Sequence, residues 1–145
     1  MATYLFKTEP SEFSFADLQA AKAPSVWDGV SNAAAIGFLR RVKVGDEVLI
    51  YHTGDEKAVV GLAAVTGGPR EDPKRPGLTA KGETKFVVVE LKALKPAASP
   101  MTLATIKQDK RLANLPLLKQ SRLSVMEIEP AAAKIIKQAC GFLKA

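Results

Sequence analysis

Short runs of β-branched and aromatic residues recur along the chain and predict β-strands. The first run ends just before Pro10, which cannot donate to a strand ladder, and the third follows a turn at Gly45-Asp46. The predicted strands cover residues 4–7, 26–27, 47–52, 59–66, 86–94 and 124–128.

Apolar residues at helical spacing predict short helices between these strands. Ser14 and Asp17 have the spacing of a capping box, and Asn32 is a good helix cap. Pro130 suits the first position of a final helix. The predicted helices begin at residues 14, 32, 101 and 130, and the second and third end at residues 41 and 108.

Proline and glycine mark the predicted loops. Residues 67–84 contain three prolines and four glycines with mixed charge, which is typical of a mobile surface loop, so we expect poor order there. Residues 97–100 are predicted to be a connection and residues 114–120 to be irregular. No repeat or linker divides the chain. The pattern therefore predicts one domain over residues 1–145, of the α+β class, with a small mixed β-barrel and short surrounding helices.

The composition is typical of a folded globular domain. Hydrophobic residues make up 47% and charged residues 25% of the 145 positions, which excludes a disordered protein. The longest apolar stretch, residues 58–65, is far shorter than the roughly 20 residues of a membrane span, and the first residues lack the order of a signal peptide. A single cysteine, Cys140, excludes an internal disulfide. We expect a cytoplasmic monomer with no membrane contact.

The charge is uneven. The net charge is +6, yet residues 1–30 carry two basic and four acidic side chains, so the basic surplus lies in the later part of the chain. Such a balance favours a polyanionic partner such as nucleic acid, because each neutralised phosphate releases counterions. A charged, solvated surface is the alternative interpretation.

The common enzyme motifs are absent from the sequence: there is no phosphate-binding Walker loop, no dinucleotide glycine fingerprint, no His-Glu-x-x-His and no Gly-x-Ser-x-Gly. His52 is the only histidine, and a hydrogen bond at a strand end is its simplest role. Cys140 lies in an apolar helix, where cysteine is usually a small packed residue. With one cysteine and one histidine, no zinc site of nitrogen and sulfur ligands can form, so no metal is expected.

Three polar clusters are candidates for binding. Trp27, the only tryptophan, stands beside a turn and precedes Asn32, which suits a planar ring, although a lone tryptophan also commonly anchors a core. Lys7 and Glu9 place a cation and a carboxylate at a strand end, where solvated charges are also common. The third cluster combines an amide, hydroxyls and a guanidinium, which suit a phosphate or a base edge but also occur in polar turns: Gln120, Ser121, Arg122 and Ser124.

Taken together, four ordered blocks resemble the EVE domain family. The blocks are residues 4–14 (YLFKTEPSEFS), 27–32 (WDGVSN), 44–53 (VGDEVLIYHT) and 116–125 (PLLKQSRLSV). The resemblance implies a PUA-like fold with a pocket beside the barrel, no cofactor, and recognition of modified bases in DNA or RNA, with cytosine derivatives as the best-supported class. Three positions depart from the family pattern, where Ser31, Ala33 and Ala35 replace basic or aromatic residues.

On this basis we interpret the chain as a non-enzymatic module that reads a modified base in nucleic acid. Trp27 is expected to stack on the base, and its loss is expected to leave the fold intact. Asn32, Ser121 and Ser124 are expected to bind the base edge, Arg122, Lys7 and Lys119 the phosphates, and Tyr51 and Leu123 a methyl or hydroxymethyl group.

The alternative is a sensor or enzyme that acts on a small free nucleobase-like metabolite, with Glu9 or His52 as the acid or base.

Overall fold

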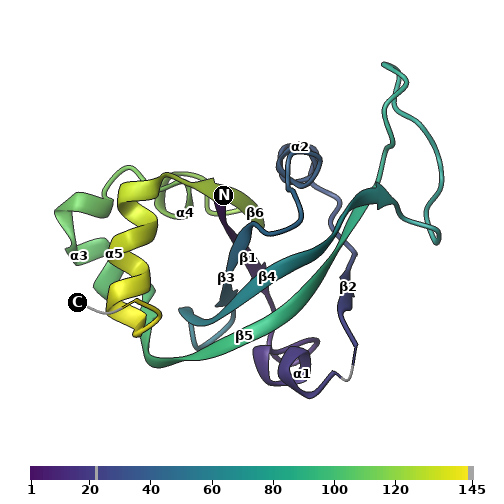
Figure 1. The fold of residues 1–145 in the computed structure, drawn as a ribbon. Helices are drawn as coiled ribbons and strands as arrows, with labels where there is room; N and C mark the ends of the chain where they lie inside the picture. The colour runs from purple at the N-terminus through teal and green to yellow at the C-terminus, as the bar shows by residue number, and fades with distance from the viewer. Residues whose placement is uncertain (22, 144–145) are drawn as a thin grey trace.

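The structure is a computed structural model that describes residues 1–21 and 23–143, and it consists of one six-stranded sheet with short helices around it (Figure 1). The α+β class predicted from the pattern is confirmed. The strands are β1 (Thr3–Thr8), β2 (Ser25–Trp27), β3 (Glu47–His52), β4 (Ala58–Glu71), β5 (Val87–Thr102) and β6 (Val125–Ile128). The helices are α1 (Phe15–Ala20), α2 (Ala33–Leu39), α3 (Leu103–Gln108), α4 (Pro116–Lys119) and α5 (Pro130–Cys140), with a 3₁₀ turn, η1, at Lys110–Leu112.

The sheet is curled but open. Its strand order is β2-β5-β4-β3-β1-β6, with β1 parallel to β3 and the other neighbours antiparallel. Phe6 of β1 and Trp27 of β2 have ring centroids only 5.6 Å apart, although three strands stand between them in this order. Yet no ladder joins β2 to β6 among the described residues, so the sheet predicted as a small mixed β-barrel is not closed. Both edge strands are short, which limits the pairing that closure would need.

The position of β1 inside the sheet explains why the first predicted strand is continuously apolar. β1 lies between β3 and β6, and Tyr4, Leu5 and Phe6 are all almost completely buried. A strand that is covered on both faces needs no alternation of apolar and polar residues. β3 pairs with β1 residue by residue, from Thr3 opposite Glu47 to Thr8 opposite His52, which brings the carboxyl ends of both strands together.

The two longest strands, β4 and β5, extend beyond the predicted ones. β4 continues to Glu71 into the predicted loop, and β5 continues to Thr102 through Pro96 and Pro100, so residues 97–100 are strand rather than a connection. Repeated shifts of register along the β4–β5 ladder account for this, because bulges tolerate residues without a backbone N–H. The two strands run out together into a hairpin that projects from the body (Figure 1).

Side-chain caps define the starts of α1, α2 and α3. Ser14 and Asp17 form the predicted capping box at α1, and the side-chain amide oxygen of Asn32 accepts from the Ala35 N–H at α2. Thr102 caps α3, so that helix begins at Leu103 rather than at residue 101. The segment predicted to be irregular contains the single turn of α4.

α1 packs closely on the sheet. A Cβ atom added at Gly61 of β4 would collide with the Phe15 ring, so this glycine lets the start of α1 lie against the strand. At the other end of the chain, Cys140 of α5 is fully buried with its thiol against the Val59 carbonyl oxygen, as expected for a packed cysteine. No helix among the described residues is long and apolar enough to cross a membrane.

Candidate functional site

A cavity of about 450 Å³ lies where the end of β1 meets β2 and the loops that follow these strands. Sites for small molecules are typically roughly 300–1,000 Å³ in volume. Both apolar and charged side chains line it: Lys7, Thr8, Glu9, Glu12, Phe13, Val26, Trp27, Asp28, Gly29, Val30, Ser31 and Ser124.

Trp27 belongs both to the cavity wall and to the core. Its side chain is 7% exposed and lines the cavity. Its ring lies 5.6 Å from that of Phe6 in a tilted arrangement and 5.9 Å from that of Phe13 in an edge-to-face arrangement. Because the ring fills space beside the fully buried Phe6, the structure predicts that removal of Trp27 destabilises the fold, contrary to the expectation from the sequence.

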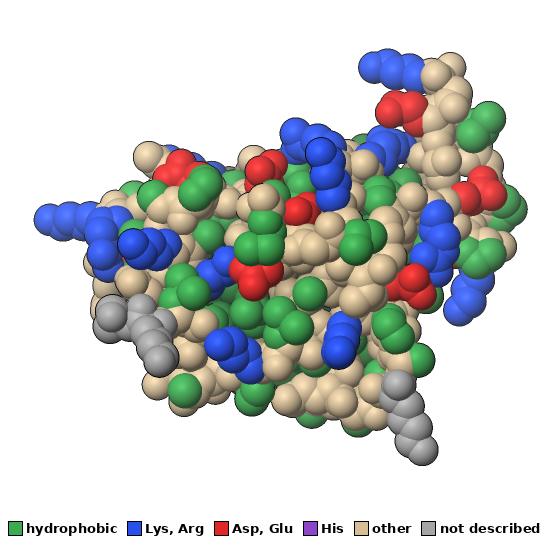
Figure 2. All heavy atoms as spheres, viewed as in Figure 1, with side chains coloured by type: hydrophobic (Ala, Val, Ile, Leu, Met, Phe, Trp, Pro, Cys, Tyr) green, Lys and Arg blue, Asp and Glu red, His purple; other side chains and the backbone are tan. Residues whose placement is uncertain are grey.

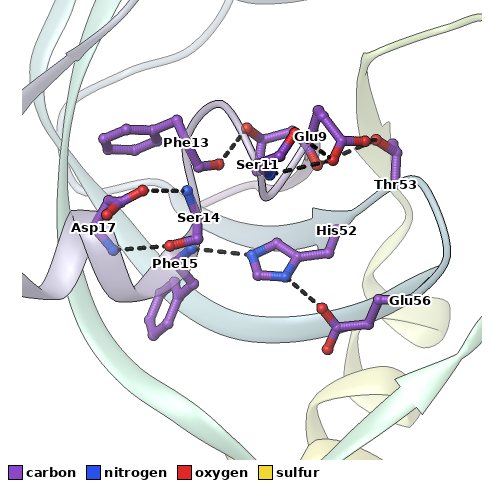
Figure 3. A network of polar contacts seen from close by, with 10 residues as sticks. Glu9, Ser11, Phe13, Ser14, Phe15, Asp17, His52, Thr53 and Glu56 are labelled. Carbon is purple, nitrogen blue, oxygen red and sulfur yellow. Dashed lines mark hydrogen bonds and ion pairs between the residues drawn. The ribbon is translucent and has the colours of Figure 1, made fainter.

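Hydrogen bonds fix the loop between β1 and α1, which supplies one wall (Figure 3). The Glu9 carboxylate accepts from the Ser11 N–H and hydroxyl at 3.2 and 3.0 Å, and from the Thr53 hydroxyl at 3.4 Å. These bonds, the Ser11 backbone bond foremost, lower the pKa of Glu9 below its ordinary value. The Thr8 hydroxyl donates to the Phe13 carbonyl at 2.6 Å, which closes the loop on itself.

His52 holds the far end of the same loop. Its Nε2 accepts from the Phe15 N–H at 3.0 Å, and its Nδ1 lies 2.7 Å from the Glu56 carboxylate (Figure 3). Because Nε2 accepts, Nδ1 carries the hydrogen and donates to Glu56. The predicted role of His52, a hydrogen bond at a strand end, is confirmed. His52 acts on the cavity through the wall that it supports and does not line the cavity itself.

Replacement of His52 by leucine is expected to lower the free energy of unfolding by about 1–3 kcal/mol, the penalty for a buried N–H without a partner. Since the loop carries Glu9 and Phe13, ligand affinity should fall as well. His52→Gln is the matched control, because its amide oxygen can accept from Phe15. Thermal unfolding of both variants checks this, and a leucine variant as stable as the glutamine variant would contradict it.

The cavity is rich in carboxylates. Glu9, Glu12 and Asp28 line it together with one cation, Lys7. The Lys7 ammonium donates to the Ser121 carbonyl at 2.9 Å, and burial lowers the pKa of Lys7 from its ordinary value. The site therefore offers several acceptors to a ligand with N–H groups and disfavours a phosphate inside it. Among the described residues, no group of three or more His, Cys, Asp or Glu side chains could hold a metal ion.

A basic groove of about 310 Å³ adjoins the cavity. Ser31 lines the cavity while its neighbour Asn32 lines the groove, and Ser124 and Leu123 share the two spaces in the same way. The Lys7 bond to Ser121 joins the two walls. The groove is lined by Asn32, Ala34, Lys119, Gln120, Ser121, Arg122 and Leu123.

The predicted site residues fall into three sets: those that line the cavity, those that line the groove, and those that line neither. Their binding roles stay predictions. Lys7, Glu9, Trp27 and Ser124 line the cavity, and Asn32, Ser121, Arg122 and Leu123 line the groove.

Tyr51 and His52 line neither space. Tyr51 is 3% exposed within β3, where burial raises its pKa. Tyr51 therefore shares neither space with Leu123, and its methyl-binding role stays a prediction.

Several lining residues were missed in the sequence. Phe13 and Glu12 follow the first predicted strand, in a block that the family resemblance included, and that was the available signal. Arg75 is different, because it comes from the hairpin, 44 positions from Ser31. Its guanidinium donates to the Ser31 hydroxyl at 3.0 Å and to the Val30 carbonyl at 3.1 Å. No local pattern could have indicated this contact.

The curled sheet, with its tryptophan-walled cavity and the adjoining basic groove, defines a small α+β domain of PUA-like fold. A family model for the EVE domain matches residues 2–139. The chain belongs to the EVE domain family, as its four sequence blocks indicated.

Solved structures agree with this assignment. An NMR structure of a Rhodopseudomonas palustris protein is 36% identical with a TM-score of 0.88, over 100% of this chain and 97% of that one. A crystal structure of the human THYN1 protein, in complex with 5-methylcytosine-containing DNA, is 24% identical with a TM-score of 0.85, over 94% and 95% of the two chains, and shows the shared fold. Rat thymocyte nuclear protein 1 is 38% identical over 73 residues, which cover 43% of this chain and 32% of that relative. The match thus spans about a third of the length of the rat protein.

Proposed function

We propose that this chain is a non-enzymatic nucleic-acid-binding module that takes a modified base, a cytosine derivative, into the cavity walled by Trp27. The observation that carries the proposal is the combination in one cavity of an aromatic wall with carboxylate acceptors. The human THYN1 protein, which shares the fold, was crystallised with 5-methylcytosine-containing DNA, and this supports the choice of ligand class.

The acceptors favour a base with an exocyclic amino group. Carboxylates accept hydrogen bonds from the N4 amino group of cytosine, whereas thymine and uracil present a carbonyl at that position. Glu12 and Asp28 are exposed residues of the lining and can accept such a bond. The same negative charge keeps phosphates out, so the base enters the cavity while the backbone stays at the basic groove.

The free energies of stacking and base flipping indicate that binding needs both the cavity and the groove. Stacking of a base on an aromatic side chain contributes about 1–3 kcal/mol, while unstacking and flipping cost a few kcal/mol. Stacking alone therefore roughly balances flipping. Hydrogen bonds in the cavity and phosphate contacts in the groove, from Arg122 and Lys119, supply the remainder.

The difference in binding free energy between the modified and the unmodified base is expected to be modest. A methyl group in an apolar pocket contributes discrimination of about 1–3 kcal/mol. The apolar lining residues Phe13, Val26 and Val30 are the candidates for this contact, in place of Tyr51.

Binding screens test the proposal directly. Oligonucleotides that carry 5-methylcytosine, 5-hydroxymethylcytosine, thymine or unmodified cytosine at one position are titrated, and Trp27 fluorescence reports binding because it is the only tryptophan. We expect the modified cytosines to bind most tightly. Equal affinity for all four would refute modified-base reading.

Arg122→Ala is expected to weaken all of these oligonucleotides by a similar factor, because a phosphate contact carries no base information. The slope of log affinity against log salt should fall by about 0.9 on duplex or 0.7 on single strands, the value of one contact. Lys134→Ala is the control, since Lys134 is exposed on α5 and lines neither the cavity nor the groove. Equal slopes for Arg122→Ala and wild type would remove Arg122 from the backbone-contact role.

A catalytic role would need a positioned general base. Glu9 is the lining carboxylate whose oxygens accept from Ser11 and Thr53, so it is engaged in holding the loop. We therefore expect no released base and no mass change when modified oligonucleotides are incubated with the protein and examined by mass spectrometry. Product that forms with wild type and disappears in Glu9→Gln would favour the enzyme alternative.

A further inference from the structure

The hairpin arm, residues 72–86, projects from the body between β4 and β5 (Figure 1). Hydrogen bonds and a cation–π contact nevertheless fix the part of the arm that adjoins the sheet. Asp72 is 3% exposed and accepts from the Lys74 N–H and from Arg75 Nε, both at 2.9 Å. The Arg75 guanidinium lies 4.0 Å from the centre of the Phe86 ring. Both sides of the hairpin are thus joined at one point, which holds the arm in a defined direction.

The arm is also attached to the cavity. Arg75 donates to Val30 and Ser31, and the Lys74 ammonium lies 3.9 Å from the Asp28 carboxylate. All three partners line the cavity.

On the β5 side of the arm, the Arg40 guanidinium donates to the Thr84 carbonyl at 2.6 Å. This bond fixes the β5 side of the arm. The contacts of Arg75 and Lys74 with cavity residues place the start of the arm at the rim of the proposed base-binding site.

The free charge of the arm is positive. Lys74, Lys81 and Lys85 are exposed, and among the described residues Lys81 and Lys85 are paired with no carboxylate. The Asp72 charge is matched by Arg75, which leaves Glu83 as the arm's other carboxylate. Figure 2 shows basic side chains along the arm and at its end. Three exposed ammonium groups on a fixed projection suit a polyanion.

We propose that the hairpin arm is a second nucleic-acid contact surface, which binds the phosphate backbone of the polynucleotide whose base occupies the cavity. The proposal rests on the proposed function. Residues 28–32 border the cavity, the arm and the groove, so a strand that crosses this rim meets Lys119 and Arg122 at the groove and the three lysines at the arm. A free base reaches only the cavity, so the arm acts on polymers alone.

The test compares two double variants. Lys81→Gln/Lys85→Gln removes the two arm cations that touch no cavity residue, and Lys95→Gln/Lys134→Gln removes two exposed lysines that lie outside the arm, the cavity and the groove. Each is titrated at several salt concentrations with a 5-methylcytosine duplex and with the unmodified duplex. Free 5-methylcytidine is titrated in parallel.

For the arm variant we expect duplex affinity to fall about tenfold at 0.1 M salt and the salt slope to fall by about 2, with nucleoside affinity unchanged. The control variant should keep the wild-type slope. Equal slopes for the two variants would overturn the arm proposal while the modified-base reading stands, and an equal loss of nucleoside affinity would overturn it too. Arm-dependent binding without preference for 5-methylcytosine would support the arm and refute modified-base reading.

Discussion

Trp27→Ala is expected to weaken binding of the base about 5- to 150-fold and to lower the free energy of unfolding by about 3–5 kcal/mol. The first effect follows from the loss of about 1–3 kcal/mol of stacking. The second follows because the ring packs against Phe6 in the core and Phe13 in the loop, so its removal leaves a cavity between them. One residue thus couples the stability of the fold to recognition.

Trp27→Phe separates these two effects. A phenyl ring keeps an aromatic wall and fills most of the space beside Phe6, so we expect a folded protein with an intermediate affinity. Chemical denaturation gives the stability of each variant, and titration with a fluorescently labelled oligonucleotide gives the affinity. Wild-type affinity in a folded Trp27→Ala variant would show that the base does not stack there.

Local pattern was sufficient to predict much of the sheet. β3 occupies Glu47–His52, the residues predicted, because a run of β-branched and aromatic residues follows a clear turn. The caps at Ser14 and Asn32 were also visible, since a cap is made by residues three positions apart. In both cases neighbours in sequence determine the structure.

Features that depend on distant pairing were not predictable in this way. The strand lengths of β4 and β5 are set by their mutual ladder and its bulges, which override the proline and glycine signals at Pro100 and Gly67. Closure of the barrel likewise depends on whether β2 and β6 meet, and no local signal reports this.

The site shows the same division. Lys7, Glu9 and Trp27 could be selected because each stands at a strand end, but their assembly into one cavity requires the curl of the sheet that brings β2 near β1. The role of Arg75 at Ser31 depends on a hairpin that was predicted to be a mobile loop. Site residues at the strand ends were therefore predictable, and Arg75, which holds the cavity rim at Ser31, was not.

Lys137 of α5 illustrates the energetic side of such distant contacts. Its ammonium donates to the Thr3 hydroxyl at 3.1 Å and pairs with the Glu47 carboxylate, and the two paired side chains are only 11% and 21% exposed. From the sequence alone, a lysine in a helix is expected to be solvated. In the structure Lys137 instead links the C-terminal helix to the starts of β1 and β3.

Lys137→Met is expected to lower the free energy of unfolding by about 3 kcal/mol, because it leaves a largely buried carboxylate without its partner. This is the low end of the range for buried pairs, since Glu47 keeps about a fifth of its exposure. Lys134→Met, on the exposed side of the same helix, should change stability little. The double variant Lys137→Met/Glu47→Gln should recover most of the loss, because neither charge then remains unpaired. Denaturant unfolding of wild type, Lys137→Met, Glu47→Gln and the double variant gives the coupling between the two positions. A double variant no more stable than Lys137→Met would show that lost packing, and not the unpaired charge, causes the destabilisation.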